Sequence, residues 1–170
     1  MDNKKFLTVM AVFDDKTQKI MHDLQDILIK NVGEGTQTMG IPFHVTLGSF
    51  ATYEIEKVIE KIDEACAAAN AFELNFLGQG SFGDKVLFLD PEKTEELVRL
   101  RSYFENDYAH GYEWVPHATL FCGSDGQVQR AREILRSLDL PSKAKIVGIE
   151  LGEFFPAEKK YSVTFKKGEI

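Results

Sequence analysis

Apolar residues along the chain change between the spacing of a strand and the spacing of a helix. Residues 6–13 form an apolar run rich in β-forming residues and predict a buried strand. Asp15 and Gln18 resemble a capping box, and the helical apolar spacing after them continues to about Asn31. Residues 32–40 are rich in Gly and Thr and predict a loop. The chain is therefore expected to open with a strand, a helix and a loop.

The rest of the chain contains two segments of the same order, in which a strand is followed by a helix and then by two strands. The first segment is predicted as a strand carrying His44, a helix over 53–70 capped by Thr52, and the strands of a hairpin over 72–77 and 85–89. A helix opened by Asp90 and Pro91 follows. The second segment is predicted as a strand carrying His117, a helix from Ser124 to about Leu138 with a Ser124/Gln127 capping box, and strands near 145–154 and 160–166. This order predicts two similar α+β halves. No linker composition separates them, so a single bilobal domain over residues 1–170 is expected.

Composition and charge indicate an ordinary globular protein and argue against duplex DNA as a partner. The chain has 170 residues, of which 44% are hydrophobic and 28% are charged, so it is long enough to bury a core. Its 20 Lys and Arg against 27 Asp and Glu give a net charge of -7, and no run of basic residues offers a track for phosphates. We therefore expect no binding to duplex DNA, whereas a small anionic ligand held by local donors fits the sequence.

Signals for export and for membrane insertion are weak. The apolar run near the N-terminus is short, ends in Asp14 and Asp15, and lacks a small-residue cleavage site, which favours a first strand over a signal peptide. No stretch approaches the length needed to span a bilayer. Cys66 and Cys122 are expected to be buried free thiols in a reducing compartment. These features predict a cytoplasmic protein, expected to be a monomer.

One four-residue motif occurs twice, as His44-Val45-Thr46-Leu47 and as His117-Ala118-Thr119-Leu120, with a proline one or two residues before each histidine. Two such His-x-Thr-Leu motifs arise by chance in only about 1 in 10,000 sequences of this composition. In a strand, side chains two residues apart lie on the same face, about 6.5 to 7 Å apart. Each histidine and its threonine therefore point the same way, while the apolar members of the motif point to the opposite, packed face.

This arrangement fits acid-base chemistry at a phosphate. Two imidazoles that face each other across a cleft can serve as general base and general acid near neutral pH. Two hydroxyls can donate hydrogen bonds to the non-bridging oxygens of a phosphate between them. The two halves are expected to meet at such a cleft along an approximate two-fold axis.

The duplicated motif and its setting resemble the 2H phosphoesterase superfamily, in particular its bacterial 2',5' RNA ligase-like branch. The likeness extends from the opening strand and helix to the closing strand pair, where Ile149-Glu150-Leu151 and the turn around Pro156 precede Tyr161. It implies a bilobal α+β fold with antiparallel sheets that line a central cleft, and catalysis without a metal or another cofactor. By this resemblance His44 and His117 are the acid/base pair, and Thr46 and Thr119 hold the phosphate.

Two aromatic residues near the second motif are further candidates for substrate binding. Phe121 stands next to the motif, where some relatives carry a basic residue just beyond it, and strand alternation places it on the face of His117 and Thr119. It is expected either to stack on a base or to fill the cleft floor. Trp114 in the preceding loop can also meet a base, although a lone tryptophan more often serves packing.

Other motifs have simpler interpretations. His22 and His110 are predicted to be structural. Two histidines with threonine partners fall short of a zinc site, so no metal is expected. Residues 78–83 match the string G-x-G-x-x-G, but a strand pattern follows them instead of a helix, which predicts a hairpin turn and no dinucleotide site.

The resemblance implies a metal-independent phosphodiesterase that opens a 2',3'-cyclic phosphate of a nucleotide or RNA end to a 2'-phosphate, and the paired motifs fit that chemistry. The same machinery would join a 5'-hydroxyl in a 2',5' linkage. A nucleotide-binding protein that keeps the cleft without turnover is the alternative, and ADP-ribose cyclic phosphate and 2',5'-linked oligonucleotides remain open as substrates. The sequence does not assign which histidine is the base.

Overall fold

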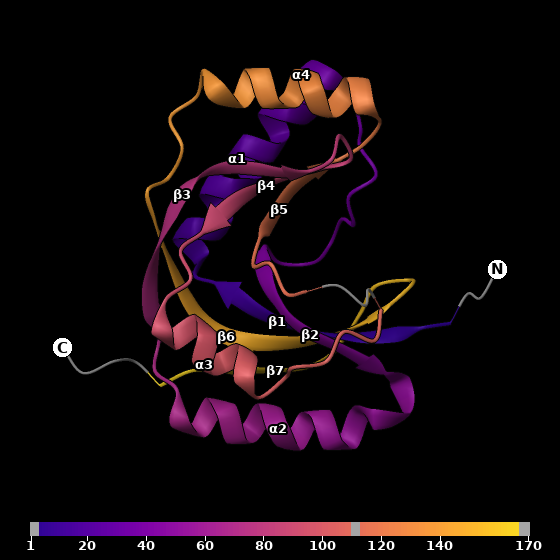
Figure 1. The fold of residues 1–170 in the computed structure, drawn as a ribbon, viewed down its shortest axis with the longest axis vertical. Helices are drawn as coiled ribbons and strands as arrows, with labels where there is room; N and C mark the ends of the chain where they lie inside the picture. The colour runs from indigo at the N-terminus through magenta and orange to yellow at the C-terminus, as the bar shows by residue number, and fades with distance from the viewer. Residues whose placement is uncertain (1–3, 110–112, 167–170) are drawn as a thin grey trace.

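The computed structural model describes residues 4–109 and 113–166 (Figure 1). Its elements are, in chain order, β1 (Phe6–Phe13), α1 (Asp15–Val32), β2 (His44–Ala51), the 3₁₀ turn η1 (Thr52–Glu54), α2 (Ile55–Ala68), β3 (Phe72–Phe82), β4 (Val86–Pro91), α3 (Glu95–Ser102), β5 (Ala118–Cys122), α4 (Asp125–Arg136), β6 (Lys143–Phe154) and β7 (Glu158–Thr164).

The strands of the described residues form a seven-stranded antiparallel sheet in the order β2-β1-β6-β3-β4-β5, with β7 also paired to β6. Strand β6 joins the two parts of the sheet. Its residues 143–146 pair with β3, and its residues 148–153 pair with β7 on the same edge, while β1 pairs along the other edge. In Figure 1, α1 and α4 lie with β3, β4 and β5, and α2 and α3 lie with the remaining strands. The predicted α+β architecture of two helix-flanked parts is confirmed.

The core lies between the strands and these helices. The apolar members of both motifs, Val45, Leu47, Ala118 and Leu120, have no exposed surface and belong to the main hydrophobic cluster. The motif histidines and threonines are only partly buried. This difference follows the alternation of side chains along a strand, and it directs the polar pair of each motif away from the helices.

The predicted helix start at Asp90 and Pro91 is wrong. Both residues belong to β4, where Pro91 pairs with Phe76, and the helix begins later, after Thr94. The Thr94 hydroxyl accepts a hydrogen bond from the Leu97 amide at 3.2 Å. Pairing with β3 thus overrides a local signal for a helix start, and the next capping residue takes its place.

The starts of the first two helices also differ from prediction. Asp14, one residue before the predicted Asp15, caps α1 by accepting from the Thr17 amide at 3.0 Å. The Gln18 carboxamide instead bonds to the backbone of Phe43, accepting from its N–H and donating to its carbonyl, both at 2.8 Å. Thr52, predicted as a helix cap, opens the 3₁₀ turn before α2. Gln18 therefore ties the start of α1 to the residue before His44. The predicted Ser124/Gln127 capping box of α4 is present.

Candidate active site

The first motif begins the edge strand β2. The Nδ1 atom of His44 lies 2.8 Å from the Pro42 carbonyl oxygen, two residues back along the chain. A carbonyl only accepts, so Nδ1 carries the hydrogen when this bond forms. In the neutral ring, Nε2 then has the lone pair and is the atom able to take a proton.

The second motif repeats this geometry. The Nδ1 atom of His117 lies 2.8 Å from the Val115 carbonyl oxygen, again two residues back. The His117 ring also lies edge-on to Phe82, with ring centroids 4.7 Å apart, and 5.4 Å from the ring of Phe88. Each imidazole is thus oriented by a local backbone carbonyl, and both direct Nε2 away from it.

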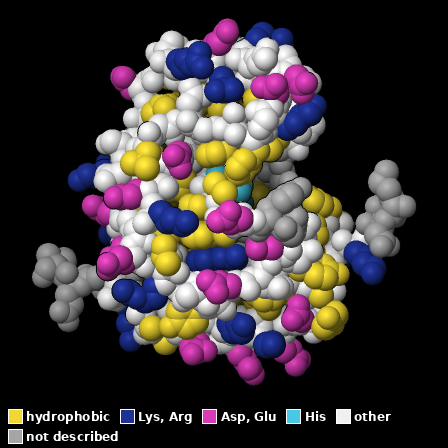
Figure 2. All heavy atoms as spheres, viewed as in Figure 1, with side chains coloured by type: hydrophobic (Ala, Val, Ile, Leu, Met, Phe, Trp, Pro, Cys, Tyr) yellow, Lys and Arg dark blue, Asp and Glu magenta, His cyan; other side chains and the backbone are white. Residues whose placement is uncertain are grey.

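The two motifs come together although 73 positions separate their histidines. One cavity of about 240 Å³ is lined by His44 of the first motif and by Thr119 of the second, and the loop of residues 36–43 forms much of its wall. His117 and Thr46 are not among the residues that line this cavity, and the link between the two histidines is electrostatic, because the charge of His117 lowers the pKa of His44. Figure 2 shows histidine atoms among hydrophobic side chains, in a hollow between the two ends of the molecule.

The surroundings of His44 keep its ring neutral. The pKa of His44 is lowered to about 4, chiefly by burial and also by the charge of His117, and these effects outweigh the bond to Pro42, which raises it. At pH 7 the His44 imidazole therefore lacks the second proton and has the form of a general base. Burial also raises the pKa of the Cys122 thiol, which lines the same cavity as a neutral group.

The lowered pKa of His44 predicts that the protein loses stability in mild acid. Unfolded chains protonate this histidine below about pH 6.5, whereas the folded chain does so only near pH 4, so the free energy of unfolding falls between these values. Between pH 7 and pH 5 the unmodified protein should lose up to about 2 kcal/mol more than the variant His44→Gln. Urea unfolding at both pH values measures this difference. Equal losses of unfolding free energy in the two proteins would contradict the lowered pKa of His44.

Each motif ends in a β-bulge. In β5, Leu87 pairs with Phe121 and the next residue of β4, Phe88, pairs with Thr119, so Leu120 is the extra residue. In β2, Val9 pairs with Gly48 and Met10 pairs with Thr46, so Leu47 is extra. A bulge interrupts the alternation of side chains along its strand. The bulged residue is thus the leucine of the motif in both halves.

The bulge corrects the expectation for Phe121. Leu120 and Phe121 are consecutive, yet both point into the core, and Phe121 has no exposed surface. Simple alternation would have placed Phe121 beside His117 and Thr119. In this structure its ring cannot stack on a ligand, and it serves packing instead.

Trp114 is partly buried against the core. Its indole N–H donates to the Thr46 carbonyl oxygen at 2.9 Å, and the cationic groups of Lys93 and Arg101 each lie 5.4 Å from a centroid of its rings. These contacts give Trp114 a role in holding β2, while stacking on a base stays a prediction.

Phe82, which the sequence did not single out, is 39% exposed and touches His117. Phe82 lies within the Gly-rich segment 78–83, which was predicted as a hairpin turn, but residues 78–82 belong to β3 and the turn follows them.

The profile of the 2'-5' RNA ligase superfamily matches residues 35–154, which include both motifs and more than half of the chain. The chain belongs to this superfamily. The match confirms the resemblance found in the sequence. A search of curated proteins found no match.

Several solved structures share the fold of this chain. They are LigT of E. coli complexed with 3'-AMP (TM-score 0.62, 10% identity, 97% of this chain and 100% of that chain covered), LigT complexed with phosphate (0.55, 13%, 98% and 100%), and TT0787 of Thermus thermophilus (0.65, 12%, 96% and 100%). At these identities the likeness shows the fold alone. It extends over β1, α1 and β7, which the superfamily match leaves out.

Other features considered from the sequence are His22, His110, a metal site and a membrane-spanning helix. His22 is exposed on α1, lines the cavity and lies edge-on to Phe43, with ring centroids 5.0 Å apart. His110 lies outside the described residues. Over residues 4–109 and 113–166, no group of three or more His, Cys, Asp or Glu side chains is placed to hold a metal ion. In the same residues, no helix has both the length and the apolar character needed to cross a membrane.

Proposed function

We propose that the protein is a phosphodiesterase that hydrolyses a 2',3'-cyclic phosphate to a 2'-phosphate without a metal. Membership of the 2'-5' RNA ligase superfamily supports a phosphodiesterase or ligase type of activity. The observation that carries the finer proposal is the pair of equivalent imidazoles, each bonded through Nδ1 to the carbonyl two residues back. Such a pair supplies both proton transfers that opening a cyclic phosphate requires.

The roles of the two histidines follow from their surroundings. His44, held neutral by burial, takes a proton from the attacking water at Nε2. The water oxygen bonds to phosphorus, the bond between phosphorus and the ribose 3'-oxygen breaks, and His117 gives that oxygen a proton. The Thr46 and Thr119 hydroxyls donate to the non-bridging oxygens. The cycle ends with His44 protonated and His117 neutral, and solvent exchange restores the starting forms.

The same geometry accommodates ligation. If the attacking group is the 5'-hydroxyl of another RNA end, His44 takes the proton of that hydroxyl, and the product carries a 2',5' linkage. The net charge of -7 favours short ends over long duplexes as substrates. LigT of E. coli has been crystallised with 3'-AMP and with phosphate, which supports a nucleotide as the first ligand to try.

The test is incubation with the four nucleoside 2',3'-cyclic phosphates in the presence of EDTA, with the product identified by chromatography and phosphorus NMR. We expect 2'-nucleotides. The rate should rise with pH as His44 loses its proton near pH 4 and fall at higher pH as the acid loses its own. A profile that is flat between pH 5 and pH 9 would contradict an imidazolium acid.

The alternative function is a nucleotide-binding protein with the same cavity. Binding of 2'-AMP or 3'-AMP without any product from cyclic nucleotides would favour it. ADP-ribose cyclic phosphate and 2',5'-linked oligonucleotides belong in the same panel, because the acid-base pair acts on the phosphate and does not select the rest of the molecule.

A further inference from the structure

The two bulges share a feature that the established family membership does not assign. In each, the carbonyl oxygen of the bulged leucine accepts a hydrogen bond from a buried polar side chain of a helix. Arg101 of α3 donates from Nη1 to the Leu47 oxygen at 2.7 Å. Gln25 of α1 donates from Nε2 to the Leu120 oxygen at 2.9 Å. The two halves of the protein thus hold equivalent backbone atoms in equivalent ways.

Both donors are strongly buried, which is unusual for their residue types. Gln25 is 4% exposed and Arg101 is 8% exposed. Gln25 lies on the buried side of α1 together with Met21, Leu24 and Leu28, and it also lines the cavity of His44 and Thr119. A polar side chain at such a place needs a specific partner, and the bulge carbonyl is that partner.

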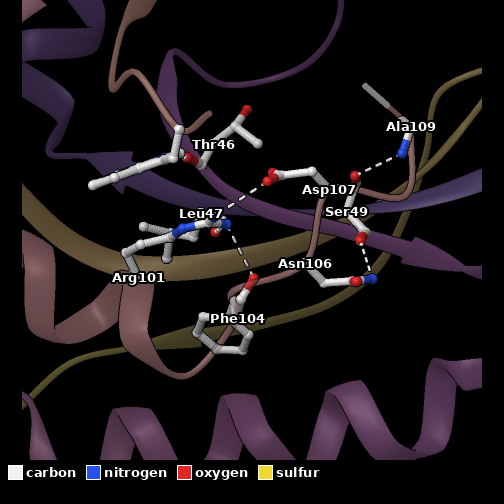
Figure 3. A network of polar contacts seen from close by, with 9 residues as sticks. Thr46, Leu47, Ser49, Arg101, Phe104, Asn106, Asp107 and Ala109 are labelled. Carbon is white, nitrogen blue, oxygen red and sulfur yellow. Dashed lines mark hydrogen bonds and ion pairs between the residues drawn. The ribbon is translucent and has the colours of Figure 1, made fainter. Parts of the chain in front are cut away.

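The first motif has additional support (Figure 3). Arg101 also donates to the Phe104 carbonyl oxygen and to the Asp107 carboxylate, both at 3.2 Å. Trp114 donates to the carbonyl oxygen of Thr46 itself at 2.9 Å. The consecutive carbonyls of Thr46 and Leu47 therefore both accept hydrogen bonds from side chains outside the sheet.

The position of the bulges gives these contacts a consequence for the site. Each bulge immediately follows a motif threonine, and a bulge re-aims the side chains next to it. The direction of each threonine hydroxyl therefore depends on the conformation of the following leucine. We infer that Gln25 and Arg101 are positioning residues that aim the Thr119 and Thr46 hydroxyls at one shared phosphate. This inference rests on the proposed function for its ligand.

A double-mutant cycle tests the role of Gln25. Gln25→Met removes the donor and nearly keeps the size of the side chain, and Thr119→Val removes the hydroxyl and keeps its shape. Gln25→Met should lower kcat/KM for a 2',3'-cyclic nucleotide about tenfold, but less than about twofold when Thr119→Val is already present. The matched control is Thr46→Val, in whose background Gln25→Met should keep its full effect.

General destabilisation gives a different result. It would act on both motifs, so equal effects of Gln25→Met in the two threonine backgrounds would overturn the inference. If Gln25→Met does not fold, the mirror cycle uses Arg101→Lys, which keeps a positive charge beside Asp107 but loses the fork of the guanidinium. Its effect should disappear with Thr46→Val and persist with Thr119→Val, and the reverse pattern would overturn the inference.

Binding of 2'-AMP, measured by isothermal titration calorimetry, separates this inference from the proposed function. A chain that binds 2'-AMP but turns over no cyclic nucleotide contradicts the proposed function alone, and the same cycles measured in Kd then decide the role of Gln25. If Gln25→Met and Thr119→Val act independently of each other on both kcat/KM and Kd, the inference is contradicted and the proposed function is not. A chain that neither binds nor reacts contradicts both.

Discussion

Replacement of either motif histidine by alanine is expected to lower the turnover of a 2',3'-cyclic nucleotide by about 10²- to 10⁴-fold, the usual contribution of a general acid or base. His44→Ala removes the group that burial keeps neutral, and His117→Ala removes the proton donor of the proposed mechanism. Both rings are held through Nδ1 by local carbonyls at 2.8 Å, so their loss should leave the backbone of the strands in place. Initial rates under saturating and limiting substrate measure the effect.

The two variants should also differ in the way their rates depend on pH. His44→Ala is expected to lose the acid limb of the profile, and His117→Ala is expected to lose the alkaline limb. His22→Ala is the matched control, because His22 lines the same cavity but lies outside both motifs. Its turnover should stay within about threefold of the unmodified protein, well below the effect of losing an acid or base. Activity of His44→Ala or His117→Ala at the level of the control would contradict acid-base catalysis by this pair.

The order of strands and helices could be predicted because it depends on local periodicity. The first strand, Phe6–Phe13, has the predicted bounds, and the helices that carry a regular apolar stripe were found to within a few residues. The start of α3 was missed because Asp90 and Pro91 carry a valid local signal that pairing with β3 overrides. Local signals fail where a residue distant in sequence provides the hydrogen bonds.

The leucine that ends each motif shows that local sequence patterns also fail at the candidate site. Strand alternation assigned the repeated Leu47 and Leu120 only to packing. Their bulges, and the resulting burial of Phe121, appear only once β4 and β1 are paired beside them. The donors Arg101 and Gln25 lie 54 and 95 positions away, so no local pattern could have connected them to these leucines.

The sequence also gave no reason to single out Gly48, although the structure makes its lack of a side chain essential. A Cβ atom at Gly48 would lie 2.1 Å from the Phe104 carbonyl oxygen and 3.2 Å from the Asn106 carbonyl oxygen. Both are backbone atoms, so neither can move away by a rotation of its side chain. Gly48 therefore allows the segment after α3 to run along the outer edge of β2, where the Ser49 amide donates to the Asn106 carbonyl oxygen at 2.8 Å.

Gly48→Ala is accordingly expected to lower the free energy of unfolding by about 3 kcal/mol, and the melting temperature by about 10 °C. The added methyl group must push the Phe104–Asn106 backbone away from β2, which strains the hydrogen bonds of Ser49. Calorimetry or urea unfolding measures the loss. Gly126→Ala in α4 is the control, since the nearest atom to its Cβ is the flexible Arg130 guanidinium at 3.5 Å, and alanine favours helix by about 1 kcal/mol over glycine.

The comparison of these two glycines isolates the contact along β2. Both substitutions add the same methyl group and reduce the freedom of the unfolded chain in the same way, so that contribution cancels between them. The remaining difference reports the close approach of Phe104 to Gly48. A melting temperature of Gly48→Ala equal to that of Gly126→Ala would mean that this segment does not lie against β2. The Arg101 contact to the first motif depends on the same packing, because Arg101 also bonds to Phe104.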